Sequence, residues 1–308
     1  MVKSEIQPSI DELLDDLGVP VQPPRGASVS KKPGLNAADK EILSDIFDML
    51  KSACASKARP LPMIHHFACT GGTILSRCLG AQPNVALLSE IDPLSPSPLG
   101  KPGFAPYDLI RQLQTGPRIV SVDTVSDIFI DYLSSLYDNV TALGYHLVIR
   151  DHTHSHFCVR SSPDSRKSIA EILGKQFEIR SVLTVRHPLD SFLSLRRKGW
   201  VMFAPDTMEE YAKRYTEFLD RYPNAPIVKY EDFVEDPAST ARLMTSKLGL
   251  SYFENWEKVV PLVRYSGDSG RSGDKVSIRE RRPVSGELMK ELDSSAAYRA
   301  LCSRLRYE

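Results

Sequence analysis

A glycine- and threonine-rich turn follows the apolar run at residues 62–67. Its centre comprises Thr70, Gly71, Gly72 and Thr73. Glycine lets the backbone approach an anion closely, and the N-terminus of a following helix directs free N–H groups at that anion. The threonine hydroxyls add two more donors. The pattern therefore predicts an anion site, although an ordinary strand-to-helix turn has the same composition and no Walker A motif, GxxxxGK[ST], is present.

A second candidate anion site lies at residues 185–194, with the sequence VRHPLDSFLS. Arg186 stands at the end of an apolar run, Pro188 suits the first turn of a helix, and Ser194 lies two turns further on. The arginine guanidinium is a rigid fork of donors that matches a phosphate group. The alternative interpretation is that Arg186 ends a strand and pairs with an acid such as Asp190.

Alternating histidines follow the apolar run at residues 146–149. They are His152, His154 and His156. Histidine exchanges protons near neutral pH, so one of them is a candidate general base. If the segment were extended, all three would face the same side and could bind zinc, but the sequence offers no evident fourth ligand. We therefore expect one catalytic histidine and no metal ion.

The two turns together resemble the sulfotransferase family that uses 3′-phosphoadenosine-5′-phosphosulfate (PAPS). In that family a first loop, commonly [KR]-S-G-[TG]-[TS], wraps the 5′-phosphosulfate, and a second pattern, R-x-P-x-D-x-x-x-S, holds the 3′-phosphate. The second pattern is complete in this chain, and the resemblance implies that Arg186 and Ser194 bind the 3′-phosphate. It implies that the first loop, which is P-loop-like, holds the phosphosulfate through Cys69, Thr70, Gly71, Gly72, Thr73 and Ile74.

Two later segments extend the resemblance, which covers roughly residues 61–283. The stretch YEDF that begins at Tyr230 is similar to a family segment, and the resemblance assigns Tyr230 to the cofactor site. The glycine-rich stretch at 266–275 is similar to the loop that closes over the 3′-phosphate. Its residues assigned to cofactor binding are Arg271, Ser272 and Gly273.

The resemblance also implies roles for the residues after the apolar run at 146–149. In cytosolic members of the family the matching strand ends in Lys-Thr-His, and that histidine is the base. This register makes His152 the base that deprotonates the acceptor, and it places Arg150 at the lysine. Asp151 is a second candidate base, because some branches of the family use a carboxylate.

One position departs from the family pattern. Cys69 stands where the family usually has Lys or Arg. By analogy with phosphoryl transfer, a loose transition state depends on nearby positive charge. Arg77 or Arg150 could supply that charge, the enzyme could be slow, or activity could have been lost. The alternatives to an active sulfotransferase are a catalytically impaired protein that binds PAPS or its product adenosine 3′,5′-bisphosphate (PAP), and a P-loop small-molecule kinase, against which the missing Walker lysine counts.

Strands that alternate with helices must position these residues. Short apolar strands between helices imply a three-layer α/β sandwich with a central parallel sheet, and ligands bind such sheets at the carboxyl ends of the strands. The predicted strands are 62–67, 119–122, 146–149, 179–185 and 226–228. The predicted helices that pack on them are 73–79, 126–137, 168–173, 189–197, 208–221 and 237–249.

Composition narrows the function classes. The chain has 308 residues, with 39 Lys and Arg against 39 Asp and Glu, so its formal net charge is zero. This balance argues against a nucleic-acid-binding protein and mildly against a polyanionic glycan as acceptor. The five cysteines match no zinc motif and favour a reducing, cytoplasmic location over a disulfide framework. The sequence shows no secretory signal and no apolar run long enough for a membrane span.

Residues 1–38 are expected to form a flexible extension, and residues 39–308 the sulfotransferase domain. Within the extension, the segment 9–17 has apolar residues at helical spacing behind a capping box, so a short amphipathic helix could dock on a protein partner or on its own domain. The acceptor is expected to be a small molecule or carbohydrate, held by loops at 88–107 and 154–166.

Other candidate residues can be explained as structural or solvated residues. His65 and His66 are expected to be structural rather than to line the pocket. Trp200 and Tyr230 could each stack on adenine or serve only in packing. The basic residues Arg279, Arg281 and Arg282 are expected to be a solvated run.

Overall fold

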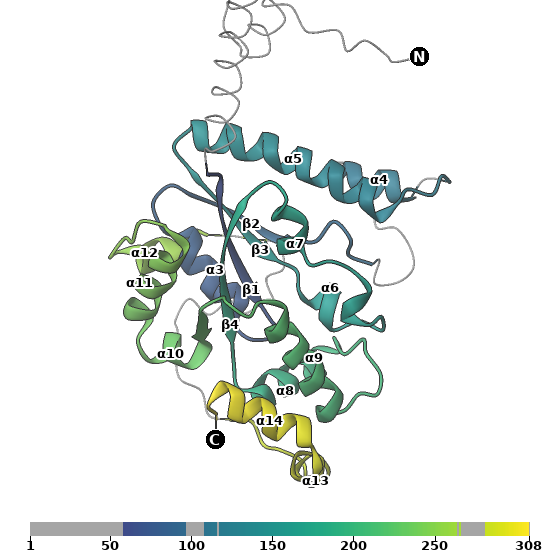
Figure 1. The fold of residues 1–308 in the computed structure, drawn as a ribbon. Helices are drawn as coiled ribbons and strands as arrows, with labels where there is room; N and C mark the ends of the chain where they lie inside the picture. The colour runs from purple at the N-terminus through teal and green to yellow at the C-terminus, as the bar shows by residue number, and fades with distance from the viewer. Residues whose placement is uncertain (1–57, 97–107, 116, 264, 266–280, 308) are drawn as a thin grey trace, which may run out of the picture. The chain divides into compact units, whose positions relative to one another are not determined.

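The apolar runs form a five-stranded parallel sheet in the computed structural model of the chain (Figure 1). The strand order is β2-β3-β1-β4-β5, which places β1 at the centre. All pairings between neighbouring strands are parallel. The strands are β1 (Pro60–His66), β2 (Val85–Ile91), β3 (His146–Asp151), β4 (Glu178–Val185) and β5 (Ile227–Lys229).

The structure describes residues 58–96, 108–115, 117–263, 265 and 281–307. All of them belong to the unit Ala58–Glu308. The expected domain boundary at residue 38 and the expected helix at 9–17 lie outside the described residues, and both stay predictions. The cofactor residues expected at 271–273 lie outside them as well.

The predicted α/β class with a central parallel sheet is confirmed, but two details of the strand prediction are wrong. Residues 119–122 do not form a strand, because Ser121 caps the next helix and accepts a hydrogen bond from the Thr124 amide at 3.1 Å. Strand β2 was not predicted, and its last four residues fall within the expected acceptor loop at 88–107. Only Leu87 of β2 is buried, and the strand continues beyond its short apolar run at 85–88 into the polar residues Ser89 and Glu90.

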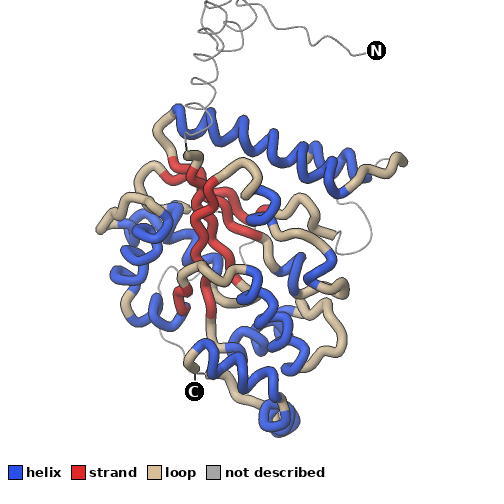
Figure 2. The backbone as a smooth tube through the Cα atoms, in the orientation of Figure 1, coloured by secondary structure: helices blue, strands red, loops and turns tan. Residues whose placement is uncertain are grey.

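Helices cover both faces of the sheet and complete the three layers (Figures 1 and 2). On one face, Ile64 of β1 packs with α3 (Gly72–Gly80) and α11 (Pro237–Leu248). On the other face, Met63 packs with α5 (Val122–Ala142) and α7 (Ile169–Leu173). Successive side chains of a strand point to opposite faces, so one apolar strand contributes to both layers.

A third apolar cluster lies beyond the carboxyl ends of the strands. Phe67, directly after β1, stacks on Tyr215 of α9 (Met208–Arg221), with ring centroids 4.4 Å apart. Residues of α8 (Pro188–Lys198) and α14 (Ala296–Leu305) complete the cluster. This packing holds in place the segments that leave β1 and β4.

The connections that leave β1 and β4 run in opposite directions across the sheet. After β1 the chain passes through α3 to β2 at one edge, and after β4 it passes through α8 and α9 to β5 at the other edge. Open α/β sheets bind ligands in the crevice at such a switch point. The remaining helical segments are α4 (Leu109–Thr115), α6 (His154–Phe157), η1 (Pro163–Ser165), α10 (Tyr230–Glu235), α12 (Trp256–Val259), η2 (Val260–Leu262) and α13 (Gly286–Ser294).

A layer of polar side chains is buried between the sheet and the end of α9. His65 Nδ1 lies 2.9 Å from Asp151 Oδ2, and His65 Nε2 lies 3.0 Å from Ser181 Oγ. Tyr222, which caps α9, donates its hydroxyl to Asp151 Oδ2 at 3.0 Å and stacks on the His65 ring. Burial alone would raise the pKa of Asp151, but its hydrogen bonds to His65 and Tyr222 lower that pKa, so the carboxylate stays ionised.

None of the helices in the described part of the chain is both long and apolar enough to cross a membrane. The cysteines in the described ranges form no disulfide: they are Cys69, Cys78, Cys158 and Cys302. Burial raises the pKa of the Cys78 and Cys158 thiols, so these two are protonated at neutral pH.

Tyr222→Phe tests the buried polar layer, because it removes one donor from Asp151 and keeps the ring that stacks on His65. Hydrogen bonds to charged groups contribute about 1.5–3 kcal/mol, so we expect the free energy of unfolding at neutral pH to fall by about that amount. The pKa of Asp151 is lowered by folding, so this contribution is complete above the ordinary carboxyl value of 3.8 and shrinks as the pH falls below it. Urea denaturation at neutral and acidic pH measures both effects.

Tyr132→Phe is the matched control, because the Tyr132 side chain is 62% exposed. It should leave the free energy of unfolding unchanged within about 0.5 kcal/mol. An equal loss of stability in the two variants would contradict the assigned role of the Tyr222 hydroxyl.

Candidate functional site

The first turn predicted from the sequence joins β1 to α3 through two residues with left-handed backbones. Cys69 has a φ of 64° and Gly71 has a φ of 92°. Positive φ is uncommon for a residue other than glycine, so the surrounding structure must hold Cys69 in this conformation. Gly71 is the N-cap of α3, and the first amides of a helix have no partner within it. The turn therefore ends on the N–H groups that an anion site uses.

Two aromatic rings lie directly against the glycines of the turn. A Cβ at Gly71 would lie 2.3 Å from Tyr230 Cδ2, and a Cβ at Gly72 would lie 2.3 Å from His66 Cδ2. Neither ring could keep its place beside a larger residue. Tyr230, which the resemblance assigns to the cofactor site, is thus next to the turn.

The two threonines of the turn have different environments. Thr70 is buried, and its hydroxyl and its amide both donate to the Phe67 carbonyl, at 2.7 and 3.2 Å. Thr73 Oγ1 instead accepts a hydrogen bond from Arg150 Nη2 at 3.4 Å. Because the Thr70 hydroxyl already donates to Phe67, only the Thr73 hydroxyl can still donate a hydrogen bond to a ligand. Ile74, the last residue of the expected loop, lies in α3. It packs against the apolar cluster between the sheet, α3 and α11.

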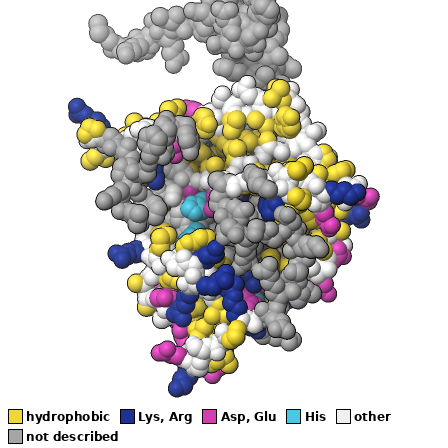
Figure 3. Space-filling model, turned by 180° about the vertical axis from the view of Figure 1, so that it is seen from behind, with side chains coloured by type: hydrophobic (Ala, Val, Ile, Leu, Met, Phe, Trp, Pro, Cys, Tyr) yellow, Lys and Arg dark blue, Asp and Glu magenta, His cyan; other side chains and the backbone are white. Residues whose placement is uncertain are grey.

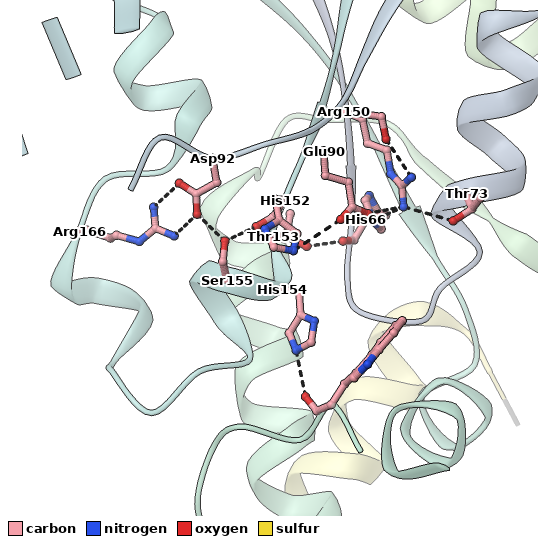
Figure 4. A network of polar contacts seen from close by, with 12 residues as sticks. His66, Thr73, Glu90, Asp92, Arg150, His152, Thr153, His154, Ser155 and Arg166 are labelled. Carbon is pink, nitrogen blue, oxygen red and sulfur yellow. Dashed lines mark hydrogen bonds and ion pairs between the residues drawn. The ribbon is translucent and has the colours of Figure 1, made fainter. Parts of the chain in front are cut away.

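Polar side chains from the ends of β1, β2 and β3 meet beside this turn (Figure 4). Arg150 is buried and forms an ion pair with Glu90, and its Nη2 lies 3.1 Å from His66 Nε2. Glu90 contacts His66 Nε2 through Oε1 at 3.2 Å and His152 Nε2 through Oε2 at 3.5 Å. One carboxylate therefore joins the cation beside Thr73 to the histidine predicted as the base.

Burial and neighbouring charges set the ionisation of this cluster. Burial alone would raise the pKa of Glu90, but the hydrogen bond with His66 and the charge of Arg150 lower it to about 2. Burial and the charge of Arg150 lower the pKa of His66. At neutral pH the cluster thus contains a guanidinium, a carboxylate and a neutral His66 ring.

The three alternating histidines do not face one side, as a zinc site would require. The chain turns into the short helix α6, and His156 is buried with its Nε2 2.8 Å from the Pro163 carbonyl. His154 Nε2 lies 2.9 Å from the Trp200 carbonyl, and burial lowers the His154 pKa to about 4. Among the residues that the structure describes, no group of three or more His, Cys, Asp or Glu could hold a metal ion. The zinc interpretation of these histidines is therefore wrong.

Asp92 ties the loop after β2 to the loop after β3. Its carboxylate accepts hydrogen bonds from both terminal nitrogens of Arg166, at 2.9 and 2.6 Å, and another from Ser155 Oγ. Such a two-pronged arginine–carboxylate pair is strong and directional. It anchors the segment 154–166, which the sequence assigns to the acceptor side and which begins at His154.

The second predicted anion site lies along α8. Arg186, directly after β4, has its Cζ 4.9 Å from the centroid of the Tyr230 ring. Its backbone amide donates to the Tyr215 hydroxyl at 3.1 Å. Ser194 is buried, and its Oγ accepts a hydrogen bond from Arg282 Nη1 at 3.2 Å. The Arg282 guanidinium is therefore directed to Ser194 of α8, whereas the Arg186 guanidinium lies against the Tyr230 ring.

Of the basic residues at 279–282 that were expected to be solvated, Arg281 is exposed, whereas Arg282 is half-buried. Arg282 contacts Ser194, and Arg281 Nε lies 3.4 Å from Asp190 Oδ1. Both arginines therefore contact α8. Arg279 lies outside the described residues. Within the described part of the chain the ion-pair partner of Asp190 is Arg281, so the alternative pairing with Arg186 is not found.

Two other candidates from the sequence point away from the first turn. Arg77 is buried in α3 and donates to the Val260 carbonyl at 2.9 Å. Asp151, the second candidate base, is buried on the opposite face of the sheet from Arg150. Of the candidates for the charge and the base, the structure therefore brings Arg150 and His152 together.

Sequence reasoning missed Glu90 and favoured a structural role for His66 over a role in lining the pocket. Glu90 is near the end of β2, and the available signal was the apolar run VALL at 85–88, which ends in polar residues as the other strands do. His66 covers Gly72 and contacts Arg150, whereas the preceding residue, His65, faces the other layer. Neighbouring histidines on one strand thus have different surroundings.

Basic side chains gather on the face of the molecule that Figure 3 shows. A histidine side chain is visible near the middle of this face, and several Lys and Arg side chains lie below it (Figure 3). A local excess of positive charge raises the concentration of anionic ligands, even though the formal net charge of the chain is zero.

Gly71→Ala and Gly144→Ala form a matched pair of variants. Both glycines have left-handed backbones, with φ of 92° and 82°, so alanine is strained at both positions by about 1–2 kcal/mol. A Cβ would collide with Tyr230 at Gly71 and would meet nothing within 4 Å at Gly144. We expect Gly71→Ala to lower the free energy of unfolding by about 1–3 kcal/mol more than Gly144→Ala, as overpacking does. Equal losses in urea denaturation would show that the Tyr230 ring is not held against the turn.

Comparison with known proteins places the chain in a family. Residues 64–254, more than half of the chain, match the model of the sulfotransferase family. The chain resembles the solved sulfotransferase domain from the curacin biosynthetic pathway (15% identity, TM-score 0.47, 82% of this chain and 99% of that chain covered). It also resembles a sulfotransferase from Alicyclobacillus acidocaldarius (15%, 0.44, 82% and 97%) and a mouse sulfotransferase complexed with PAP (10%, 0.41, 82% and 92%). No curated protein sequence matches the chain. On the family match, this chain belongs to the sulfotransferase family.

Proposed function

We propose that the chain transfers a sulfuryl group from PAPS to a hydroxyl or amine of a small-molecule or carbohydrate acceptor. The observation that carries this proposal is the position of Arg150, whose guanidinium contacts Thr73 at the start of α3. The carboxylate that holds Arg150, Glu90, also contacts His152. A cation for the transferring group and a base for the acceptor thus stand beside the same turn.

The residues at the ends of β1 and β4 fit the two charged ends of PAPS. The N–H groups around Gly71, at the start of α3, suit the 5′-phosphosulfate. Arg186 and Ser194 suit the 3′-phosphate, and Arg282 adds a second guanidinium at the Ser194 hydroxyl. The other cofactor contacts stay predictions from the resemblance: Cys69, Thr70, Gly72, Thr73, Ile74, Tyr230, Arg271, Ser272 and Gly273.

Arg150 is proposed to replace the cation that the family has at the position of Cys69. PAPS supplies an activated sulfuryl group, and transfer of such a group through a loose transition state develops negative charge on its oxygens. A preorganised guanidinium lowers the barrier most where water is excluded, and Arg150 is 3% exposed. Glu90 fixes its orientation, while the hydrogen bond of Arg150 Nη2 to Thr73 directs it toward the turn.

His152 is the proposed base. Its side chain is 33% exposed, so an acceptor can reach it, and its Nε2 lies 3.5 Å from Glu90 Oε2. An ionised carboxylate can only accept hydrogen bonds, so Glu90 favours the ring form of His152 with a proton on Nε2. This form leaves the Nδ1 lone pair to take the proton of the acceptor. The charge of Glu90 also stabilises the imidazolium that forms. Asp151 is less suited to this role, because His65 and Tyr222 already hold its carboxylate in the interior.

A catalytically impaired protein that binds PAPS or PAP is the second candidate, and Cys69 is the observation that favours it. In such a protein the charge of Arg150 would serve only to balance Glu90. Cys69→Arg would then create activity in an inert chain. The third alternative, a P-loop kinase, gains no support from the family match.

Three further expectations stay predictions from the sequence. They are a cytoplasmic location, catalysis without a metal ion, and a protein partner for the N-terminal helix. None of them enters the chemistry proposed for Arg150 and His152.

Calorimetric titration with PAP tests the nucleotide site, with ATP and adenosine 5′-monophosphate as controls. We expect PAP to bind tightest, because the two control nucleotides lack the 3′-phosphate. Arg186→Ala and Arg282→Ala should each weaken PAP binding roughly tenfold to hundredfold, which corresponds to the loss of about 1.5–3 kcal/mol from a charged hydrogen bond. Binding of adenosine 5′-monophosphate should not change in either variant.

Arg304→Ala is the matched control for these titrations, because Arg304 of α14 forms an exposed ion pair with Asp220 of α9. It should bind PAP as the wild type does. Equal affinity of the wild type for all three nucleotides would contradict the proposed cofactor, whatever affinities the variants show.

Transfer of radioactive sulfate from PAPS tests the role of Arg150. The acceptor panel would contain a phenol, an aliphatic alcohol, a primary amine and a monosaccharide. We expect Arg150→Met to lower kcat by roughly 10²–10³, the usual cost of one lost transition-state donor, with PAP affinity changed only a few-fold. Arg77→Lys, which alters a buried arginine outside the cluster, should keep kcat within about a few-fold.

Thermal denaturation must accompany this assay, because Arg150→Met leaves the buried Glu90 without its cation. Cys69→Arg in the Arg150→Met background separates the loss of catalytic charge from the loss of stability. If Arg150 supplies charge to the transferring group, the added arginine restores part of kcat. An unchanged kcat in folded Arg150→Met would contradict the proposed role.

A further inference from the structure

The buried polar layer on the other face of the sheet has the arrangement of a catalytic triad. Ser181 Oγ lies 3.0 Å from His65 Nε2, and His65 Nδ1 lies 2.9 Å from Asp151 Oδ2. A serine, a histidine and a carboxylate joined in this order are the nucleophile, the base and the group that orients the base in serine-dependent acyl transfer. Each residue comes from a different strand, and none belongs to the cluster around Glu90.

The partners of His65 fix the direction of each hydrogen bond. Asp151 is an ionised carboxylate that also accepts a bond from the Tyr222 hydroxyl, so it can only accept from His65. A neutral His65 ring that donates to Asp151 carries its proton on Nδ1 and a lone pair on Nε2. The Ser181 hydroxyl must then donate to Nε2. This is the direction in which a base activates a serine nucleophile.

Ser181 also lines a cavity of about 320 Å³ between α7, β4 and the segment after α9. Tyr222 lines the same cavity, so the triad stands at its wall. The volume is at the lower end of the range for small-molecule sites. A substrate could therefore reach Ser181 Oγ from the side of the protein away from the proposed nucleotide site.

The geometry of β4 directs a backbone donor to the same place. The Glu178 amide donates toward β1, to the Arg59 carbonyl, and the Leu183 amide donates toward β5, to the Pro226 carbonyl. Amides alternate between the two neighbours of a strand, so the Ser181 amide faces the β5 side. The pairing of β5 with β4 starts only opposite Leu183, and the cavity occupies that side of Ser181. An amide beside the nucleophile is a suitable donor for the oxyanion of an acyl-transfer intermediate.

We propose that Ser181, His65 and Asp151 form a second catalytic site, which hydrolyses small carboxylic esters. Ser181 Oγ attacks the ester carbonyl carbon, and its proton passes to His65 Nε2. The bond between the carbonyl carbon and the alkoxy oxygen then breaks, and the alcohol leaves with the proton from His65. Water attacks the acyl group on Ser181 by the same route, which releases the acid and restores the hydroxyl. Asp151 orients the His65 ring and stabilises its cationic form.

The lining of the cavity indicates the class of ester. Arg221 is already paired with Glu171, at 3.2 Å, so it is not available to an anionic substrate. The other walls combine small polar groups with short apolar ones, which suit a short acyl chain. These features select a neutral ester of a short carboxylic acid. The remaining lining residues are Ser168, Ala170, Ile179, Pro223, Asn224 and Ala225.

A fluorophosphonate probe tests the proposal on the full chain, because it reacts only with serines that a neighbouring base activates. We expect intact-mass analysis to show one adduct on the folded wild type, and peptide mapping to place it on Ser181. Wild type unfolded by heat should not react. Ser181→Ala should remain unlabelled, and His65→Gln should react at least roughly tenfold more slowly. Hydrolysis of p-nitrophenyl acetate should fall in parallel.

Ser126→Ala is the matched control, because Ser126 is also buried but donates only to a backbone carbonyl, that of Val122, at 2.7 Å. It should label at the wild-type rate. The proposal is overturned if folded wild type shows no adduct at Ser181, or if His65→Gln that keeps its thermal transition reacts as fast as wild type. The comparison of folded with unfolded wild type decides the matter even if His65→Gln does not fold.

Discussion

Successive side chains of a β-strand must point to opposite faces of the sheet, and this constraint separates two polar clusters at the ends of β1 and β3. His66 and Arg150 face the turn that precedes α3, whereas His65 and Asp151 face the end of α9. The register pairs Ile64 with Arg150, so the sheet itself brings each set together. Both sets are buried, and each therefore depends on its own hydrogen-bond partners. A slip of one residue in either strand would exchange the two faces and leave both sets unpaired.

The ion pair between Arg150 and Glu90 shows how the first cluster can be buried and still serve a charged ligand. Taking a guanidinium out of water is costly unless a carboxylate compensates, and Glu90 supplies that compensation from the neighbouring strand. The pair also fixes the guanidinium beside Thr73. In the proposed function the cation thus comes from β3 rather than from the turn, where Cys69 stands.

Aromatic packing holds the two anion-binding segments in register with each other. Phe67 and Arg186 follow adjacent strands, and both contact Tyr215 of α9, the first through its ring and the second through its backbone. Tyr230 completes this arrangement, because its ring lies against Gly71 and under the Arg186 guanidinium. The spacing between the two ends of the proposed nucleotide site is therefore set by the rings of Phe67, Tyr215 and Tyr230.

The sequence by itself determined the α/β class, most of the strands and helices, and the two turns marked by Gly71 and Arg186. These features depend on short-range patterns: an apolar run, a helix start and residues a few positions apart. Only the tertiary structure decided that Glu90 joins His66, 24 residues away, and that Arg282 reaches Ser194, 88 residues away. It also decided which histidines meet, because strand order and the alternation of side chains select partners that no local spacing encodes.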